Sequence, residues 1–216
     1  IVNTISDYHD FIPEGHKKDS AKPSYELIPE SLKTAVKCFI ITCAIRRLRD
    51  QENKHNSMLI HVSRFQSWQN HVKELVERLF NYYKNEIEAN DTAVLNEFRH
   101  IFETDTADYY SYTTISSSIL KSSNACIDKK IKVHSWDDVR KQLYPAVQKI
   151  EVKSINGSSG DVMDYQLYED TGISVIAIGG DKLSRGLTLE GLSVSYFLRA
   201  SKMYDTLMQM GRWFGY

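Results

Sequence analysis

Hydrophobic and polar residues alternate along the chain in two patterns, one typical of amphipathic helices and one typical of buried strands. The helical pattern occurs over about 30 to 49, from Trp68 to Tyr83, and from Trp136 to Val147 after a capping Ser135. The strand pattern occurs at Met58 to Val62, Lys149 to Ile155, Ile173 to Ile178 and Val194 to Leu198. Because strands and helices follow one another in this way, the pattern predicts an α/β fold, with a mostly parallel sheet flanked by helices.

Two regions show weaker patterns. Residues 1–28 carry no lasting apolar period, which favours a connector from an upstream domain, so that the main domain covers 29–216. The stretch from about 85 to 135 is polar and rich in Ser and Thr, with helical spacing around Val94 and Phe98. It predicts a largely helical insertion.

The charges of the chain nearly cancel, with 27 Lys and Arg against 28 Asp and Glu, and its hydrophobic share is 42%. This composition excludes a disordered chain, and any contact with DNA or RNA must come from local basic positions. The longest nearly apolar run, Cys38 to Ile45, is too short to cross a bilayer, and no secretion signal opens the sequence. We therefore expect a cytoplasmic protein without a membrane segment.

Three cysteines, Cys38, Cys43 and Cys126, lack both the CxxC spacing and the clustered His that a tetrahedral zinc site requires. They are typical of reduced core thiols in a cytosolic protein. We expect no metal site in this chain.

Polar and glycine-containing clusters follow the predicted strands. Ser63 and Arg64 follow the first strand, and Gly179 to Gly186 follow the third. Gln209 to Arg212 follow the fourth strand after a short helix. Because an open α/β sheet binds its ligand beyond the carboxyl ends of its strands, we expect these clusters to share one crevice.

The residue types in these clusters suit a phosphate ligand. Gly179 and Gly180 let backbone amides come close to a phosphate, and Gly186 can adopt the left-handed conformation that turns the chain. Arg185 and Arg212 present planar donors that can bind phosphate bidentately, in a nucleotide or in a nucleic-acid backbone.

The same clusters resemble motifs five and six of superfamily-two helicases and translocases. The run from Gly180 to Gly186 is similar to Thr-Asp-x-x-x-Arg-Gly, and the run from Gln209 to Gly215 is similar to Gln-x-x-Gly-Arg-x-Gly-Arg. More narrowly, the ending up to Tyr216, with the helix start Leu27 to Leu32, resembles the Z-one domain, written Z1 below. That domain follows a helicase-like ATPase domain in bacterial proteins described as restriction-type endonucleases.

The resemblance implies a RecA-like second motor domain that completes an ATP site with an upstream ATPase domain. It assigns ATP contacts to Gly180, Asp181, Arg185, Gly186 and Gln209, and the arginine finger to Arg212. It assigns nucleic-acid contacts to Ser63, Arg64, Gly157 and Gly179. ATP and Mg would be held mainly by the upstream domain, and the partners would be double-stranded DNA and other restriction-modification components.

The sequence departs from the helicase pattern in several places. Gly180 replaces the usual Thr, Thr188 replaces a frequent Asp, and Gln209 lies one residue nearer to Gly211 than in the general pattern. The last arginine of motif six would fall beyond Tyr216. The chain also has no GxxxxGK[ST] phosphate loop and no adjacent Asp-Glu pair, so it is not expected to hydrolyse ATP alone.

Two other function classes stay open at this point. Asp138 followed by Glu151 and Lys153 fits the loose spacing of a metal-dependent nuclease, in which two acids hold Mg and the Lys steadies the attacking water. Acids in a first helical turn also have an ordinary dipole reason to be there. The other alternative is an inert RecA-like scaffold that binds partner proteins. Separately, a surface ion pair is an open structural role for Arg212, and holding its loop to the neighbouring helix is one for Arg185.

Overall fold

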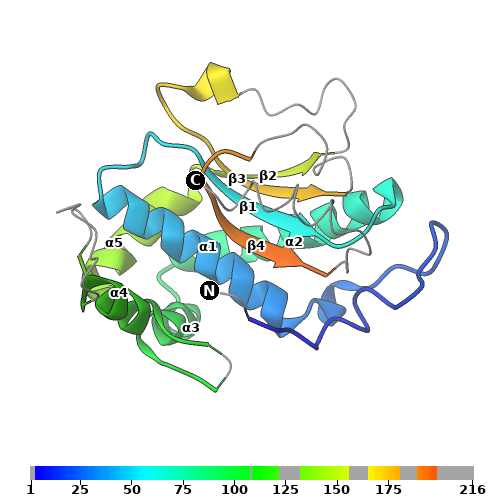
Figure 1. The fold of residues 1–216 in the computed structure, drawn as a ribbon, viewed down its shortest axis with the longest axis horizontal. Helices are drawn as coiled ribbons and strands as arrows, with labels where there is room; N and C mark the ends of the chain where they lie inside the picture. The colour runs from blue at the N-terminus through cyan, green and yellow to red at the C-terminus, as the bar shows by residue number, and fades with distance from the viewer. Residues whose placement is uncertain (1–2, 108, 122–131, 156–164, 181–188, 199–216) are drawn as a thin grey trace.

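The computed structural model describes residues 3–107, 109–121, 132–155, 165–180 and 189–198 (Figure 1). Its α-helices are α1 (Glu30–Leu48), α2 (Gln66–Glu88), α3 (Thr92–Glu103), α4 (Tyr112–Lys121) and α5 (Trp136–Val147). Its strands are β1 (Asn56–His61), β2 (Ile150–Ile155), β3 (Ser174–Gly179) and β4 (Leu192–Phe197). Short 3-10 helices lie at Tyr25–Leu27 and Tyr165–Tyr168. The predicted α/β fold is confirmed.

The described strands form one parallel sheet in the order β2-β3-β1-β4. In this register His61 of β1 lies beside Gly179 of β3 and Phe197 of β4, and Ile155 of β2 also lies beside Gly179. The carboxyl ends of all these strands therefore reach the same edge of the sheet. β1 is central and buried along its whole length, as its nearly continuous apolar run predicts.

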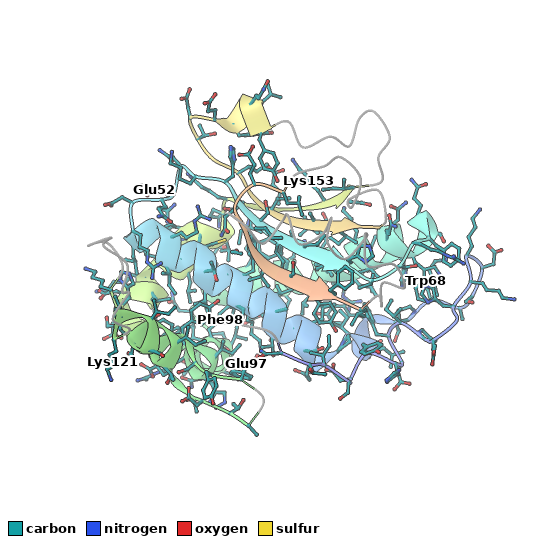
Figure 2. All side chains as sticks on the ribbon, in the orientation of Figure 1. Glu52, Trp68, Glu97, Phe98, Lys121 and Lys153 are labelled. Atoms are coloured by element: carbon teal, nitrogen blue, oxygen red, sulfur yellow. The ribbon has the colours of Figure 1, made fainter. Side chains whose placement is uncertain are left out.

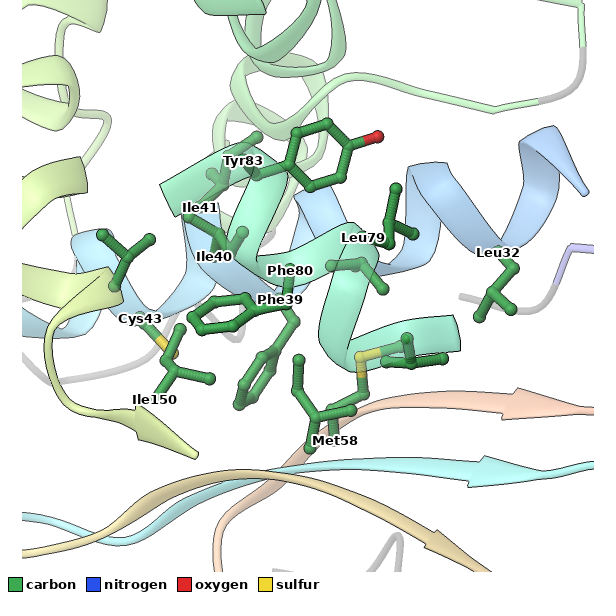
Figure 3. Close-up of a cluster of buried hydrophobic side chains, with 14 of the residues drawn as sticks. Leu32, Phe39, Ile40, Ile41, Cys43, Met58, Leu79, Phe80, Tyr83 and Ile150 are labelled. Carbon is green, nitrogen blue, oxygen red and sulfur yellow. The ribbon is translucent and has the colours of Figure 1, made fainter. Parts of the chain in front are cut away.

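Helices cover one face of the sheet and bury the larger part of the core. Met58 of β1 points toward side chains of α1 and α2, among them Phe39 and Phe80 (Figure 3). α1 also packs along α5 and against β4, whereas α2 packs against β2 and β3. The opposite face holds a smaller buried cluster around Leu59 and Ala177. Successive residues of one strand thus enter different clusters, which is the period-two rule of a pleated strand.

The region from 85 to 135 contains helices where its weak pattern predicts them. α2 continues to Glu88, and α3 begins after Asp91, whose carboxylate accepts a hydrogen bond from the Val94 amide at 2.8 Å. Phe98 of α3 belongs to the same buried core as α1. α3 therefore extends the main core, whereas α4 has no buried residue, and the division of this region into a separate insertion stays a prediction.

The N-terminal arm, residues 3–28, packs onto the domain although it has no apolar period. Phe11 is fully buried. The indole N–H of Trp68 in α2 donates to the Lys17 carbonyl at 2.9 Å, and Asp7 accepts two hydrogen bonds from Ser31 at the start of α1. The arm is thus fixed to both α1 and α2. The sequence, which predicts a connector here, does not predict these contacts.

The two described cysteines behave as predicted. Cys38 and Cys43 are free thiols on α1. Burial raises the pKa of Cys38 to about 11 and the pKa of Cys43 to about 12. Both thiols are therefore protonated and unreactive at neutral pH. Cys126 lies outside the described residues.

Within the part of the chain that the structure describes, none of the helices combines the length and the apolar character that crossing a membrane requires.

Candidate functional site

The segments after β1 and β3 meet at the carboxyl edge of the sheet. Gln69, in the first turn of α2, donates from Nε2 to the Ser63 carbonyl at 2.9 Å. A methyl group added at Gly180 would overlap Gln69 Nε2 and come within 3.0 Å of the same carbonyl oxygen. Ser63, Gln69 and Gly180 are therefore packed together, and the predicted meeting of these two segments is confirmed.

The Ser63 side chain forms a hydrogen bond within the protein. It is 1% exposed, and its Oγ lies 2.8 Å from Nε2 of His16 in the N-terminal arm. The other ring nitrogen of His16, Nδ1, lies 3.0 Å from the Pro13 carbonyl, which can only accept. Nδ1 therefore carries a proton and donates it to this carbonyl, and Nε2 forms the hydrogen bond with the Ser63 hydroxyl. The Ser63 hydroxyl ties the arm to the sheet edge.

Arg64, in contrast, is exposed at this edge. Its guanidinium lies over the Phe65 ring, 4.8 Å from the ring centroid. Such stacking orients a guanidinium while leaving its N–H donors free to bind an oxyanion. Of the residues predicted to contact nucleic acid, Arg64 is the described side chain best placed to do so.

A groove runs between Arg64 and the N-terminal arm. It encloses about 420 Å³, and its walls come from residues 8–16 of the arm, from Val62 to Phe65 and from Leu198 after β4. Tyr8 and His9 line the arm side, with ring centroids 4.4 Å apart. Aromatic rings beside cationic side chains are the usual means of holding single-stranded or locally opened nucleic acid.

His61 is a core residue, in agreement with its position between two apolar neighbours. It is 2% exposed and stacks on Phe197 of β4, with the ring centroids 4.6 Å apart. This aromatic pair fixes β1 against β4 just inside the candidate site.

Most motif residues lie outside the described part of the chain, namely Gly157, Asp181, Arg185, Gly186, Gln209 and Arg212. Gly179 and Gly180 are described and buried at the end of β3. The chain leaves β2, β3 and β4 at the carboxyl edge, and residues 156–164, 181–188 and 199–216 follow these strands directly or after one residue. The individual roles of these residues stay predictions.

The structure does not bring the nuclease candidates together. Asp138 lies in the first turn of α5, where its carboxylate accepts from the capping Ser135 hydroxyl at 2.7 Å. This hydrogen bond is the main reason why the pKa of Asp138 is lowered. Glu151 lies beyond the other end of α5, and it pairs with Lys153 at 2.7 Å. About nine residues of helix, or roughly 13 Å, separate Asp138 from the last turn of α5, too far to share an ion.

No cluster of three or more His, Cys, Asp or Glu suited to a metal ion occurs among the described residues.

A comparison with protein families identifies the chain. The model of the Z1 domain matches residues 31–216, which is most of the sequence. The chain belongs to the Z1 domain family. The match covers both segments that resemble helicase motifs, and it begins immediately after the N-terminal arm. No curated protein and no solved structure matches the chain.

Sequence reasoning missed the residues of this Z1 domain that complete the groove and the residue that packs between Ser63 and Gly180. Tyr8, His9 and His16 belong to the arm, and Gln69 lies on a helix whose pattern indicates only core packing. None of them lies in a motif or next to a predicted strand. The adjacent apolar pair Phe11 and Ile12 was the one signal in the sequence that the arm packs on the domain.

Proposed function

We propose that this Z1 domain is the second motor domain of an ATP-dependent DNA translocase belonging to a restriction-type endonuclease, acting in the cytoplasm. One observation carries the proposal. The parallel strands end at one edge, where Ser63 and Gly180 are packed together and from which the chain continues into both motif-like segments. Motor domains of this class use that edge for nucleotide and nucleic acid.

The proposed roles of the two domains follow from the absence of a phosphate loop in this sequence. Without a phosphate loop, ATP and Mg would be held mainly by a partner ATPase domain, with Gly180, Asp181, Arg185, Gly186 and Gln209 closing on the nucleotide. Arg212 would donate to the charge that develops on the transferred phosphoryl group. Closure of the two domains would then be converted into movement along DNA.

The groove supports the DNA-binding part of the proposal. Arg64 supplies a fixed charge of the correct sign, and the adjacent Phe65, Tyr8 and His9 supply ring faces. Ser63 would act through its backbone and through its hold on His16, because its hydroxyl is already bonded. The nuclease alternative receives no support from the placement of Asp138 and Glu151.

The decisive test is DNA-stimulated ATP hydrolysis by the intact protein in which a phosphate-loop domain faces this chain. Arg212→Ala should lower turnover by at least about a hundredfold, since an arginine at a phosphoryl-transfer transition state is worth on the order of a thousandfold or more. Arg212→Lys should not restore it, because a Lys lacks the planar fork. ATP affinity should change less than turnover.

The control is Arg64→Ala, which should weaken DNA binding and reduce its salt dependence while sparing basal hydrolysis. The 216-residue chain alone should show no ATPase activity, with or without DNA. Turnover by that chain, or an Arg212→Ala protein within about threefold of wild type, would refute the proposal.

A further inference from the structure

A second cationic site lies at the opposite, amino edge of the sheet. A narrow cleft there is bounded by the last turn of α1, the loop before β1, the end of α5 and the first residue of β3. Figure 2 shows Glu52, on that loop, at the other end of the molecule from Trp68, which lies beside the candidate site. Six strand residues, or roughly 20 Å, separate the two edges.

The cleft is lined by four cationic side chains and one acid. The cations are Arg46, Arg47, Lys54 and Lys149, and the acid is Glu52. Within the described part of the chain, no carboxylate lies within ion-pair distance of any of these cations. Their observed partners are neutral: Arg46 donates to the Asn56 side-chain oxygen at 3.2 Å, and Arg47 donates to the Gln142 side-chain oxygen at 3.1 Å.

Arg46 has a buried hydrogen-bond donor without an acceptor among the described residues. Its Nε is buried and finds no acceptor among the described residues, although an N–H left without an acceptor is costly. Burial also lowers the pKa of its guanidinium. A partly buried guanidinium whose acceptor, among the described residues, is a neutral amide is placed to receive an anion.

Helix-end electrostatics do not account for the cluster. Cations near the ends of α1 and α5 do suit the negative poles of these helices, but each pole is equivalent to only about half a charge. The terminal carbonyls are also already occupied by backbone amides. Arg46 O accepts from the amides of Arg49 and Gln51, and Ala146 O accepts from the Lys149 amide. The guanidinium groups are therefore not needed as caps, and among the described residues no carboxylate is ion-paired with these cations.

From these contacts we infer that the cleft between α1, α5 and the start of β1 binds a phosphate group, with Arg46 as its central ligand and Arg47, Lys54 and Lys149 around it. A phosphate accepts several charged N–H donors at once, and these cationic side chains all line the same cleft. The phosphate can come from a nucleic-acid backbone or from a small phosphorylated molecule. The site is independent of the ATP and DNA contacts proposed at the carboxyl edge.

In the first experiment, inorganic phosphate is titrated into the 216-residue chain, and chloride keeps the ionic strength constant. Binding is monitored by calorimetry and by amide chemical shifts. Arg46→Gln keeps an amide donor but removes the charge, and it should weaken phosphate binding about tenfold, as expected for loss of a charged hydrogen bond. The matched control is Arg99→Gln on α3. It makes the same change of net charge at an exposed arginine paired with Glu103 at 2.7 Å, and should leave phosphate affinity unchanged.

Stability in phosphate-free buffer separates a ligand site from a structural role. Arg46→Gln should be at least as stable as wild type there, because it relieves repulsion within the cluster, and a given phosphate concentration should protect wild type against heat more than it protects Arg46→Gln. If Arg46→Gln does not fold, Lys54→Gln on the exposed loop serves the same purpose. Absence of saturable phosphate binding by wild type, or equal binding by Arg46→Gln, would overturn the inference.

A second experiment identifies the source of the phosphate. Duplex DNA binding is measured by fluorescence anisotropy over a range of salt concentrations for wild type, Arg46→Gln and Arg99→Gln. A slope of log affinity against log salt that is lower by about one in Arg46→Gln alone assigns the site to the DNA backbone. An unchanged slope together with lost phosphate binding assigns it to a small phosphorylated ligand.

Discussion

Gly180 has two physical reasons to be glycine. The sequence pattern suggests that a backbone amide must approach a phosphate there, and the structure shows that a methyl group would overlap Gln69 and crowd the Ser63 carbonyl. Packing alone therefore explains the glycine within the described residues. The residue type by itself cannot separate the two reasons.

A double-mutant cycle can separate them. Gly180→Ala should destabilise the domain by about 1–3 kcal/mol, because the new methyl group displaces Gln69 from the buried Ser63 carbonyl. Gln69→Ala should cost a similar amount, and the double variant should cost clearly less than the sum, since one loss accounts for both changes. Urea denaturation gives the free energy of unfolding of both single variants and of the double variant.

If the double variant is fully additive, the predicted contact is wrong. The double variant can instead lose less stability than the sum of the single variants and still lack DNA-stimulated ATP hydrolysis in the intact protein. That result would mean that a ligand needs the backbone amide at Gly180.

Hydrophobic periodicity located the secondary-structure elements well wherever packing has a regular period. α1 was expected over about 30 to 49 and is observed at Glu30–Leu48, and α5 is observed at the expected Trp136–Val147 with Ser135 as its cap. β4 begins two residues before the expected Val194, because an irregularity shifts its register against β1 between Ser57 and Met58. An irregularity of this kind breaks the alternation on which the prediction depends.

The loop that enters β4 contains a glycine that the structure requires. Gly191 has a φ of +63°, and a Cβ there would overlap the His55 carbonyl group. Gly15, in the arm, has a similar φ of +71° but open space around it. The two positions share a left-handed backbone conformation and differ in crowding.

Alanine at each glycine should therefore have unequal effects. Gly15→Ala should cost about 1–2 kcal/mol, which is the penalty of a left-handed conformation for an L-residue. Gly191→Ala should cost at least about 2 kcal/mol more, because backbone atoms must move to admit the methyl group. Chemical denaturation of both variants measures the difference, and equal effects would mean that the entry to β4 is not as tightly packed as described.

At the scale of the whole molecule, the N-terminal arm packs on the core of the domain. The family match begins at residue 31, yet Phe11 is fully buried in the core that α1 and α2 build. Periodicity could not reveal this, because an irregular segment packs through single residues rather than through a repeating face. For the same reason, the arm residues that line the groove could not be predicted from the sequence. Arg64 and Gly180 could be predicted, because each lies at the end of a predicted strand.

The contribution of the arm can be measured with two substitutions. Phe11→Ala should destabilise the chain by about 3–5 kcal/mol, as expected when a buried aromatic side chain leaves a cavity. Leu27→Ala, in the same arm but 44% exposed, should change stability by less than about 0.5 kcal/mol. Thermal or urea unfolding checks both values, and a small effect of Phe11→Ala would return residues 3–28 to the role of a connector.

The position of β1 at the centre of the sheet also determines the order in which the protein can assemble. Asn56 pairs with Ser174, which lies 118 positions later in the chain, and the β4 partner lies later still. At synthesis rates of 5–20 residues per second, β1, which is buried along its whole length, therefore waits about 6–24 s for its first neighbour. During that time α1 and α2, which form through local contacts, are the elements able to shield it. Folding should accordingly be slow for a domain of this helical content, because closing the sheet requires the ends of a long chain segment to meet.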